Sequence, residues 1–407
     1  GDLGANGMGI PIGKISLYVA AAGIHPASTL PICLDVGTDN ERLLADPLYI
    51  GNRHPRLRGE AYFQVVERLV QGIKRVFPRA LLQWEDFGKD NAFALLDRYK
   101  HRILSFNDDI QGTGAVAAAA LRTALKIKGG RLSDERIAVL GFGQAGSGVA
   151  NAIVTMMEAE DGTSVENARR RIFAIDRMGL LMEGEALEAH QKNFAQPQAA
   201  IGGWPIPKDR VPNLAEVVRH GKITVLIGLA AQPGIFAGPL LSELAKNSAR
   251  PIVFALSNPT SQSETTPALV MQATADRALM ATGSPFAPFR SRSGMMMQVS
   301  QCNNLYVFPG MGLGAIVCQA TGVTHRMFHA ASSVISDLAS AEQRAAGLLL
   351  PPLNDIRRIS FEVALAVAKQ AREEGIGMAV SDEQISDLIK QAMWEPHYYP
   401  YRYSGKY

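Results

Sequence analysis

The chain has 407 residues, more than one hydrophobic core usually organises, so we expect two domains. Hydrophobic residues make up 47% and charged residues 19%, and the formal net charge of +3 comes from dispersed Lys and Arg, which argues against a nucleic-acid partner. No apolar run reaches the roughly 18 to 20 residues that span a bilayer, and no signal peptide precedes the first motif, so we expect no membrane partner and a cytoplasmic protein, with the mitochondrial matrix as alternative.

The first 110 residues alternate apolar runs with amphipathic patterns, which indicates an α/β fold. A glycine-rich loop opens the chain as if it followed a strand, so we expect that an upstream segment is missing. Residues 32–36 and 80–84 predict buried strands, and residues 60–77 predict an amphipathic helix that ends before Pro78.

Two pairs of acidic residues end apolar runs in this part of the chain. They are Glu85-Asp86, in an aromatic setting, and Asp108-Asp109. Buried carboxylates are costly without a partner, and carboxylate oxygens with open positions suit an octahedral Mg²⁺ or Mn²⁺. The alternative is that these acids cap helices or pair with Arg.

Lys14 ends a second glycine-dense stretch, residues 7–13. A lysine desolvated in such a loop would have a lowered pKa and could act as a general base. The alternative is an ordinary solvated surface lysine.

A dinucleotide-binding pattern follows. Residues 115–128 predict a helix that ends at a glycine pair, residues 137–140 a buried strand, and residues 147–159 another helix. Between this strand and helix lies a glycine fingerprint, in which the first glycine makes the tight turn, the second lets the backbone approach a pyrophosphate, and the third packs the helix on the strand. Its residues are Gly141, Gly143, Gln144, Ala145 and Gly146.

The next predicted strand, residues 172–175, ends at Asp176, 35 residues after Gly141. A carboxylate there would accept hydrogen bonds from a ribose 2′-hydroxyl and repel a 2′-phosphate, which favours NAD. Arg177 beside it could receive that phosphate, so NADP stays possible.

Further strands at residues 225–227, 252–256 and 278–281 complete a parallel, doubly wound sheet. Residues 183–213 predict a surface excursion, the chain becomes helical from about residue 305, and the three cysteines lack zinc-type spacing and indicate free thiols. Amides follow strand-like segments at the edge where such sheets bind ligands, although each could simply cap a loop: Asn258, Asn303 and Asn304.

Taken together, motifs spread over nearly the whole chain closely resemble those of the malic enzymes, and they occur in family order. They are Gly1–Lys14, Leu34–Thr38, Asp46–Tyr49, Trp84–Phe87, Phe106–Thr113, Ser257–Ser261, Ala281–Phe286 and Phe308–Gly310. We therefore expect a Rossmann-type doubly wound parallel sheet domain, residues 108–304, inserted in a second α/β domain that binds metal and substrate, residues 1–107 and 305–375. Residues 376–407 would form a C-terminal tail.

The resemblance implies oxidative decarboxylation of L-malate to pyruvate and CO₂ with reduction of NAD. It makes Lys14 the general base and Asp108 a close neighbour that tunes it. It assigns Mg²⁺ or Mn²⁺ to Glu85, Asp86 and Asp109. It also implies that amides orient the substrate carboxylate and the nicotinamide amide, namely Asn258 with one or both of Asn303 and Asn304.

Malic enzymes normally begin further upstream, in a segment that supplies a Tyr general acid and an Arg for the substrate carboxylate, and neither is matched here. A malolactic enzyme, which converts malate to lactate and CO₂, shares these motifs and is one alternative. A catalytically incomplete NAD-binding fragment is another. We expect a homodimer or homotetramer.

Overall fold

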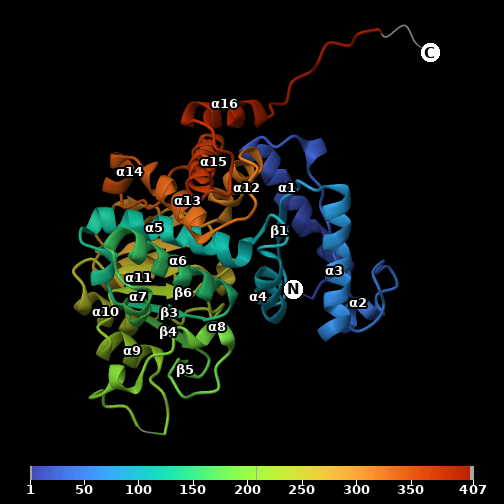
Figure 1. The fold of residues 1–407 in the computed structure, drawn as a ribbon. Helices are drawn as coiled ribbons and strands as arrows, with labels where there is room; N and C mark the ends of the chain where they lie inside the picture. The colour runs from blue at the N-terminus through green and yellow to red at the C-terminus, as the bar shows by residue number, and fades with distance from the viewer. Residues whose placement is uncertain (1, 208, 404–407) are drawn as a thin grey trace.

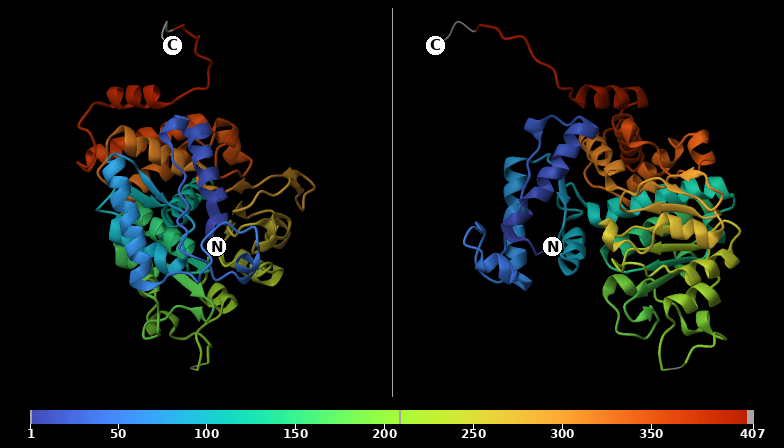
Figure 2. Two further views of the ribbon diagram at one scale, coloured as in Figure 1. Left: turned by 90° about the vertical axis from the view of Figure 1, so that its right-hand side faces the viewer. Right: turned by 180° about the vertical axis from the view of Figure 1, so that it is seen from behind.

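The computed structural model describes residues 2–207 and 209–403; Gly1 of the opening motif and the last four residues of the expected tail lie outside them. Figure 1 shows a sheet domain flanked by an N-terminal part, with a layer of C-terminal helices across the top. Residues 395–403 extend away from the body, as all three views show (Figures 1 and 2).

The N-terminal part has its own small core, built around Tyr62, Val66, Trp84 and Tyr99. Two parallel strands and four helices make up this part: α1 (Gly9–Ala22), α2 (Glu41–Ala45), α3 (Gly59–Val76), β1 (Leu82–Trp84), α4 (Lys89–Tyr99) and β2 (Ser105–Asn107). The predicted helix at residues 60–77 and the strand at residues 80–84 are thus confirmed.

The predicted strand at residues 32–36 is wrong. These residues are extended but pair with no strand in the described part of the chain. A strand needs a ladder of hydrogen bonds to a neighbour, and the β1–β2 sheet ends at β1. An apolar run therefore does not make a strand when no partner lies beside it.

The central sheet has the order β11-β8-β7-β6-β3-β4-β5, parallel except for the antiparallel edge strand β5. The order reverses between β3 and β6, which is where doubly wound sheets bind ligands. The strands are β3 (Ile137–Leu140), β4 (Ile172–Asp176), β5 (Gly179–Leu180), β6 (Val225–Gly228), β7 (Ile252–Ala255), β8 (Leu279–Thr282) and β11 (Ser300–Gln301). A separate hairpin pairs β9 (Phe289–Arg290) with β10 (Met296–Met297).

Helices cover both faces of this sheet. In β3, Ile137 and Val139 enter one core and Ala138 and Leu140 the other, as the alternation of side chains along a strand requires. The helices of this domain are α5 (Thr113–Lys128), α6 (Gln144–Asp161), α7 (Val165–Arg170), α8 (Ala189–Lys192), α9 (Leu214–His220), α10 (Gly238–Asn247) and α11 (Pro267–Thr274). The predicted doubly wound sheet and its strands are confirmed to within two residues at each end.

The C-terminal helices connect the two parts. Buried residues of α12, α13 and α15 share a core with α5 and α6 of the sheet domain and with Tyr18 and Ala22 of α1. The helices are α12 (Phe308–Val317), α13 (His325–Asp337), α14 (Ala341–Ala345), α15 (Ile356–Glu373) and α16 (Asp382–Ala392). The expected tail thus includes a helix, α16, whose buried Ile385 and Ile389 belong to this core. Met393 also packs against the core and the Trp394 N–H donates to the Gly23 carbonyl oxygen, before residues 395–403 extend outward.

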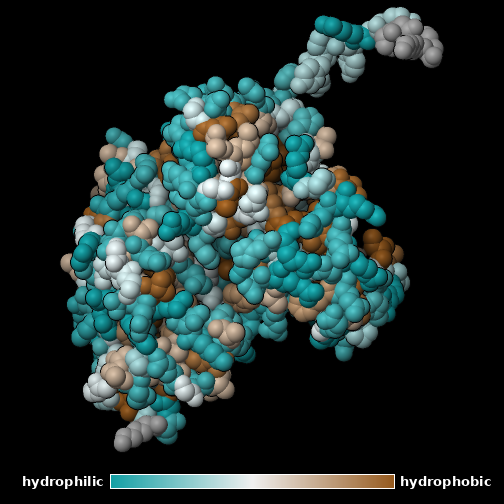
Figure 3. Space-filling model, viewed as in Figure 1, coloured by the Kyte–Doolittle hydropathy of each residue, from teal (hydrophilic) through white to brown (hydrophobic). Residues whose placement is uncertain are grey.

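The face seen in Figure 3 is mainly hydrophilic, with apolar residues gathered where the N-terminal part meets the rest. None of the helices in residues 2–207 and 209–403 is long and apolar enough to cross a membrane.

Helix α6 presses directly on the turn that carries the second acidic pair, η3 (Asp108–Gly112). A Cβ added to Gly148 would lie 1.9 Å from the Ile110 carbonyl oxygen, and one added to Gly114 would lie 2.5 Å from the Gly148 carbonyl oxygen. Glycine at this crossing therefore brings the acids close to the start of α6.

We expect Gly148→Val to lower the free energy of unfolding by about 3 kcal/mol or more, because the overlap is with backbone that cannot rotate away. Gly72→Ala near the C-terminal end of α3 is the control, since nothing lies within 4 Å of the added Cβ. This substitution should be neutral or stabilising by up to about 1 kcal/mol. Urea unfolding of both variants measures the difference, and equal midpoints would contradict this packing argument.

Candidate active site

Lys14 lies at the centre of a polar cluster between the two parts. Its Nζ lies 2.6 Å from Asp108 Oδ2 and 3.0 Å from Glu85 Oε1. The lysine comes from α1, the glutamate follows β1 and the aspartate follows β2. Because β1 and β2 are adjacent parallel strands, both acids emerge at the same sheet edge. The fold thus brings together three residues that are up to 94 positions apart.

The expectation that desolvation lowers the pKa of Lys14 is not met. Burial alone would lower it, but the charges of Asp108 and Glu85 outweigh burial and hold the pKa above its ordinary value. Burial lowers the pKa of a lysine only when no anion lies near it. The sequence could not predict the raised pKa, because the two anions beside Lys14 come from distant parts of the chain. As the residues stand, Lys14 is a protonated partner of two carboxylates.

The carboxylates of the cluster outnumber the positively charged side chains beside them. Burial, followed by the charge of Asp108, raises the pKa of Glu85 to about 8. Burial also raises the pKa of Asp109, whose Oδ2 accepts a hydrogen bond from the Asp86 backbone N–H at 2.8 Å. Asp108 is fully buried, and within the described residues its Oδ1 has no hydrogen-bond partner. One lysine therefore does not neutralise this group of carboxylates.

Two residues that the sequence did not single out complete the cluster. Gln83 donates from Nε2 to Glu85 Oε2 at 2.8 Å, and its own Oε1 accepts from the buried Tyr18 hydroxyl. Alternation along β1 places Gln83 and Glu85 on the same face, and this signal was present in the sequence. Tyr18 packs edge-on against Phe308 with ring centroids 5.1 Å apart.

The predicted amides divide between two places. Asn304 joins the cluster, since its Nδ2 donates to Asp108 Oδ2 at 3.1 Å and lies 3.1 Å from Thr113 Oγ1. Asn303 caps the turn that follows it by accepting from the Leu305 N–H. Asn258 accepts from the Ser284 hydroxyl at 2.6 Å, in the exposed loop after β7. Among the described residues, neither Asn258 nor Asn303 forms a hydrogen bond with Lys14 or the acids.

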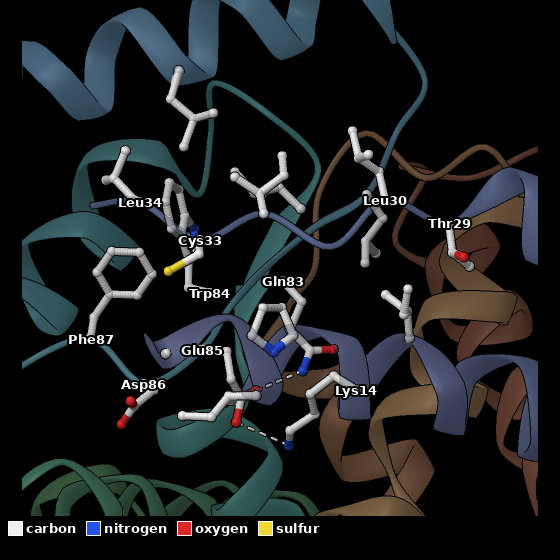
Figure 4. Close-up of a pocket in the computed structure, with 18 of the residues that line it drawn as sticks. Lys14, Thr29, Leu30, Cys33, Leu34, Gln83, Trp84, Glu85, Asp86 and Phe87 are labelled. Carbon is white, nitrogen blue, oxygen red and sulfur yellow. Dashed lines mark hydrogen bonds and ion pairs between the residues drawn. The ribbon is translucent and has the colours of Figure 1, made fainter. Parts of the chain in front are cut away.

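The predicted metal ligands lie near one another, but their side chains are not arranged to bind one ion together. Within residues 2–207 and 209–403, no three His, Cys, Asp or Glu side chains form a group that could hold a metal ion. Figure 4 shows the Asp86 carboxylate turned away from that of Glu85, which faces Lys14 and Gln83. The chemistry of the donors nevertheless suits a hard divalent cation, given the unpartnered Asp108 oxygen and the raised pKa values.

A cavity of about 260 Å³ adjoins the cluster. Lys14 and Glu85 lie at its polar end, and apolar residues such as Leu30, Leu34 and Trp84 line the remainder (Figure 4). Other polar residues in the lining include Ser28, Thr29 and Arg56. A small anionic substrate would be held beside Lys14.

The glycine fingerprint forms a tight turn at the point where the sheet order reverses. Gly141 has φ +87°, and a Cβ there would lie 2.5 Å from the Leu229 carbonyl oxygen; a Cβ on Gly146 would lie 2.3 Å from the Gly141 carbonyl oxygen. By contrast, a Cβ on Gly143 meets nothing within 4 Å. The turn thus leaves open space at the second glycine, at the N-terminus of α6, where a pyrophosphate would bind.

A second cavity of about 530 Å³ starts at this turn and is lined by Gly141, Gly143, Asp176, Arg177 and other residues. Ala145 lies in the first turn of α6. Gln144 points elsewhere, because its Nε2 donates to the Phe87 carbonyl oxygen at 2.9 Å. That bond links the start of α6 to the loop that carries Asp86, so the second cavity and the acidic cluster are connected through this loop.

The sequence matches two family models that together cover most of the chain. Residues 1–100 match the model described as "Malic enzyme, N-terminal domain", and residues 110–372 match "Malic enzyme, NAD binding domain". The chain belongs to the malic enzyme family. The resemblance predicted from the motifs is therefore confirmed, and the second model supports NAD as the cofactor of this family member.

Curated relatives agree over nearly the full chain. The NAD-dependent malic enzyme of Pseudomonas savastanoi pv. phaseolicola is 45% identical over 403 residues, and that of Vibrio parahaemolyticus is 46% identical over the same length. Each match covers 99% of this chain and 71% of the relative.

Solved malic enzyme structures show the same fold. That of Entamoeba histolytica malic enzyme has a TM-score of 0.73 at 24% identity and covers 97% of this chain and 71% of that one. The structure of malic enzyme from Pyrococcus horikoshii has a TM-score of 0.70 at 21% identity, with 95% and 76% covered. The predicted fold class, with its Rossmann-type domain, is confirmed.

Proposed function

We propose that this malic enzyme family member oxidises L-malate with NAD and releases CO₂ and pyruvate, with Lys14 as the proton acceptor. The observation that carries this is the position of Lys14 Nζ, within 3.0 Å of both Asp108 and Glu85 and in the lining of the 260 Å³ cavity. Family membership and the NAD-dependent relatives support the reaction itself.

The chain's own residues would divide the reaction as follows. Because Lys14 is protonated beside two carboxylates, it must release that proton before malate reacts. In its neutral form, Lys14 would take the proton of the C2 hydroxyl, and bound NAD would supply the acceptor for the hydride that leaves C2, so that malate becomes oxaloacetate. Asp108, which is held by a hydrogen bond from Asn304, would stabilise the positive charge that forms on Lys14. Loss of CO₂ would then leave the enolate of pyruvate, and one proton added at C3 gives pyruvate.

We further propose that Glu85, Asp86 and Asp109 hold Mg²⁺ or Mn²⁺. Support comes from the excess of buried carboxylates over lysine and from the unpartnered Oδ1 of Asp108. When bound, such an ion supplies a Lewis acid that polarises the C2 oxygen and stabilises the enolate. Glu85 and Asp109 repel each other without an ion, and both would be attracted to the bound ion.

Asp109→Asn is expected to weaken Mn²⁺ binding about 100-fold or more, because losing a residue behind the ligands already costs 10- to 100-fold at typical metal sites. Asp90→Asn is the matched control: this acid lies on the exposed first turn of α4 and should leave Mn²⁺ affinity unchanged. Mn²⁺ titration followed by electron paramagnetic resonance, without malate or NAD, measures both. Equal affinities would contradict the ligand assignment.

The reaction is tested by incubating the protein with L-malate, NAD and Mn²⁺. Equal amounts of NADH and pyruvate are expected. Lactate without net NADH would indicate a malolactic enzyme, and binding of NAD and Mn²⁺ without turnover would indicate an incomplete fragment. Malate as substrate follows from the relatives, while a homodimer or homotetramer and a cytoplasmic location stay predictions.

A further inference from the structure

Glu264 is a buried acid at the carboxyl edge of the central sheet. It is 0% exposed, and a Cβ added to Gly228, the last residue of β6, would lie 2.6 Å from Glu264 Cγ. Within residues 2–207 and 209–403, no lysine, arginine or histidine forms an ion pair with its carboxylate. A buried carboxylate without a cation is stabilised by the hydrogen bonds that it accepts, so the groups that donate them are held firmly.

These donors come from the loops that follow two neighbouring strands. Glu264 Oε1 accepts from the Ala230 N–H at 2.9 Å, in the loop after β6, and from the Ser257 hydroxyl, in the loop after β7. The same hydroxyl accepts from the Ala231 N–H at 2.8 Å, so its own proton faces the carboxylate. One side chain therefore ties the two loops together.

The loop after β6 is part of the wall of the 530 Å³ cavity, which reaches from Asp176 to Ala230. A Cβ added to Gly141 in the glycine turn would lie 2.7 Å from Ala230 Cα, so this loop packs directly on the turn. Strands β6 and β4 lie on opposite sides of β3, and Asp176 ends β4. Because a dinucleotide lies across the reversal of strand order with its adenosine ribose at the acid, the nicotinamide half belongs on the β6 side.

The loop after β7 carries Asn258, directly after Ser257. Asn258 Oδ1 accepts from the Ser284 hydroxyl at 2.6 Å, and the amide nitrogen forms no hydrogen bond within the part of the chain that the structure describes. This nitrogen is therefore available to a carbonyl or carboxylate oxygen, such as the nicotinamide amide presents. Through Ser257, Glu264 holds the backbone that carries this amide.

We propose that Glu264 is a positioning residue for the nicotinamide, which holds the loops after β6 and β7 together and so places the Asn258 amide at the nicotinamide half of the cofactor. The inference rests on the proposed oxidation of malate by NAD and on the role that the family resemblance implies for Asn258. Glu264 touches neither reactant and acts through Ala230 and Ser257.

The first test is Glu264→Met, which keeps the side-chain length and removes both acceptor oxygens. The dissociation constant for NAD should rise about 10-fold, because the loss of one well-placed hydrogen bond costs about one such factor. The constant for ADP, which carries no nicotinamide, should stay unchanged. Titration with each nucleotide, without malate, measures both constants. Equal weakening of NAD and ADP would show a merely structural role and overturn the proposal.

In turnover, kcat of Glu264→Met should fall about 100-fold, since a misplacement of about 1 Å can cost that much in rate. Glu264→Gln is the conservative variant. Its amide oxygen still accepts from Ala230 and Ser257, and its amide nitrogen replaces Oε2, which accepts only from the Ser257 N–H at 3.4 Å. We expect Glu264→Gln to restore NAD affinity and most of kcat. A Gln variant as impaired as Glu264→Met would overturn the positioning role.

Two further variants complete the set. Thr265→Val is the matched control, because this neighbour is 3% exposed and its hydroxyl has no partner among the described residues; NAD and ADP affinity should stay unchanged. Ser257→Ala removes only the hydroxyl that joins the two loops. It should weaken NAD and spare ADP even where Glu264→Met does not fold.

Asn258→Ala separates this inference from the function on which it rests. If Asn258→Ala weakens NAD binding, adding Glu264→Met should cost little more, because both changes act through the same amide. Additive losses would overturn the positioning role and leave the proposed function standing. If Asn258→Ala leaves NAD affinity unchanged, the role of Asn258 fails and that of Glu264 fails with it. A parent protein that shows the expected binding differences but forms no NADH from malate would contradict the proposed function alone.

Discussion

Replacing Lys14 by Arg should leave a folded protein that binds NAD but has lost most of its turnover. A guanidinium keeps the positive charge between Asp108 and Glu85, yet it does not give up a proton in proteins. Losing general base catalysis lowers kcat about 10²- to 10⁴-fold. NADH formation at saturating malate and NAD measures the loss.

Lys14→Ala provides the second arm of this experiment. It removes the charge and leaves two buried carboxylates facing each other, so we expect the free energy of unfolding to fall by about 3 kcal/mol or more. Lys126→Ala, which breaks the exposed pair with Asp337, is the control and should change both properties little. A kcat for Lys14→Arg within a few-fold of the parent would overturn the assigned role.

Replacing Gly143 by Ala should weaken NAD binding without affecting the fold. The added methyl meets no protein atom within 4 Å, and its φ of −89° is open to other residues. The methyl would instead occupy the approach to the pyrophosphate, where an overlap of 1 to 3 kcal/mol corresponds to roughly a 10- to 100-fold rise in the dissociation constant. Nucleotide titration and urea unfolding together measure the two effects.

Gly141→Ala is the contrasting variant in the same turn. Its φ of +87° and the Leu229 carbonyl oxygen 2.5 Å from the new Cβ make it costly to the fold itself, by about 1 to 3 kcal/mol. We therefore expect loss of stability at Gly141 and loss of NAD affinity alone at Gly143. Unchanged NAD affinity in Gly143→Ala would show that the pyrophosphate does not bind at this turn.

Much of the fold was predictable because its signals are local. The strand at Ile137–Leu140, the glycines after it and the helix at Thr113–Lys128 are encoded in a few consecutive residues whose periodicity and turn chemistry need no distant partner. The acidic pairs were also correctly expected at the ends of strands. The sequence by itself thus determined the family, the doubly wound sheet and the residue types available for chemistry.

The tertiary structure decided what depends on partners far along the chain. Residues 32–36 have the composition of a strand but no neighbour to pair with, and Lys14 is charged because β1 and β2 carry Glu85 and Asp108 to it. Gln191, in a segment without periodicity, donates to Asp176 only because the chain folds back onto the end of β4. Hydrogen-bond pairing, burial and charge are properties of neighbours in space, and sequence patterns describe neighbours along the chain.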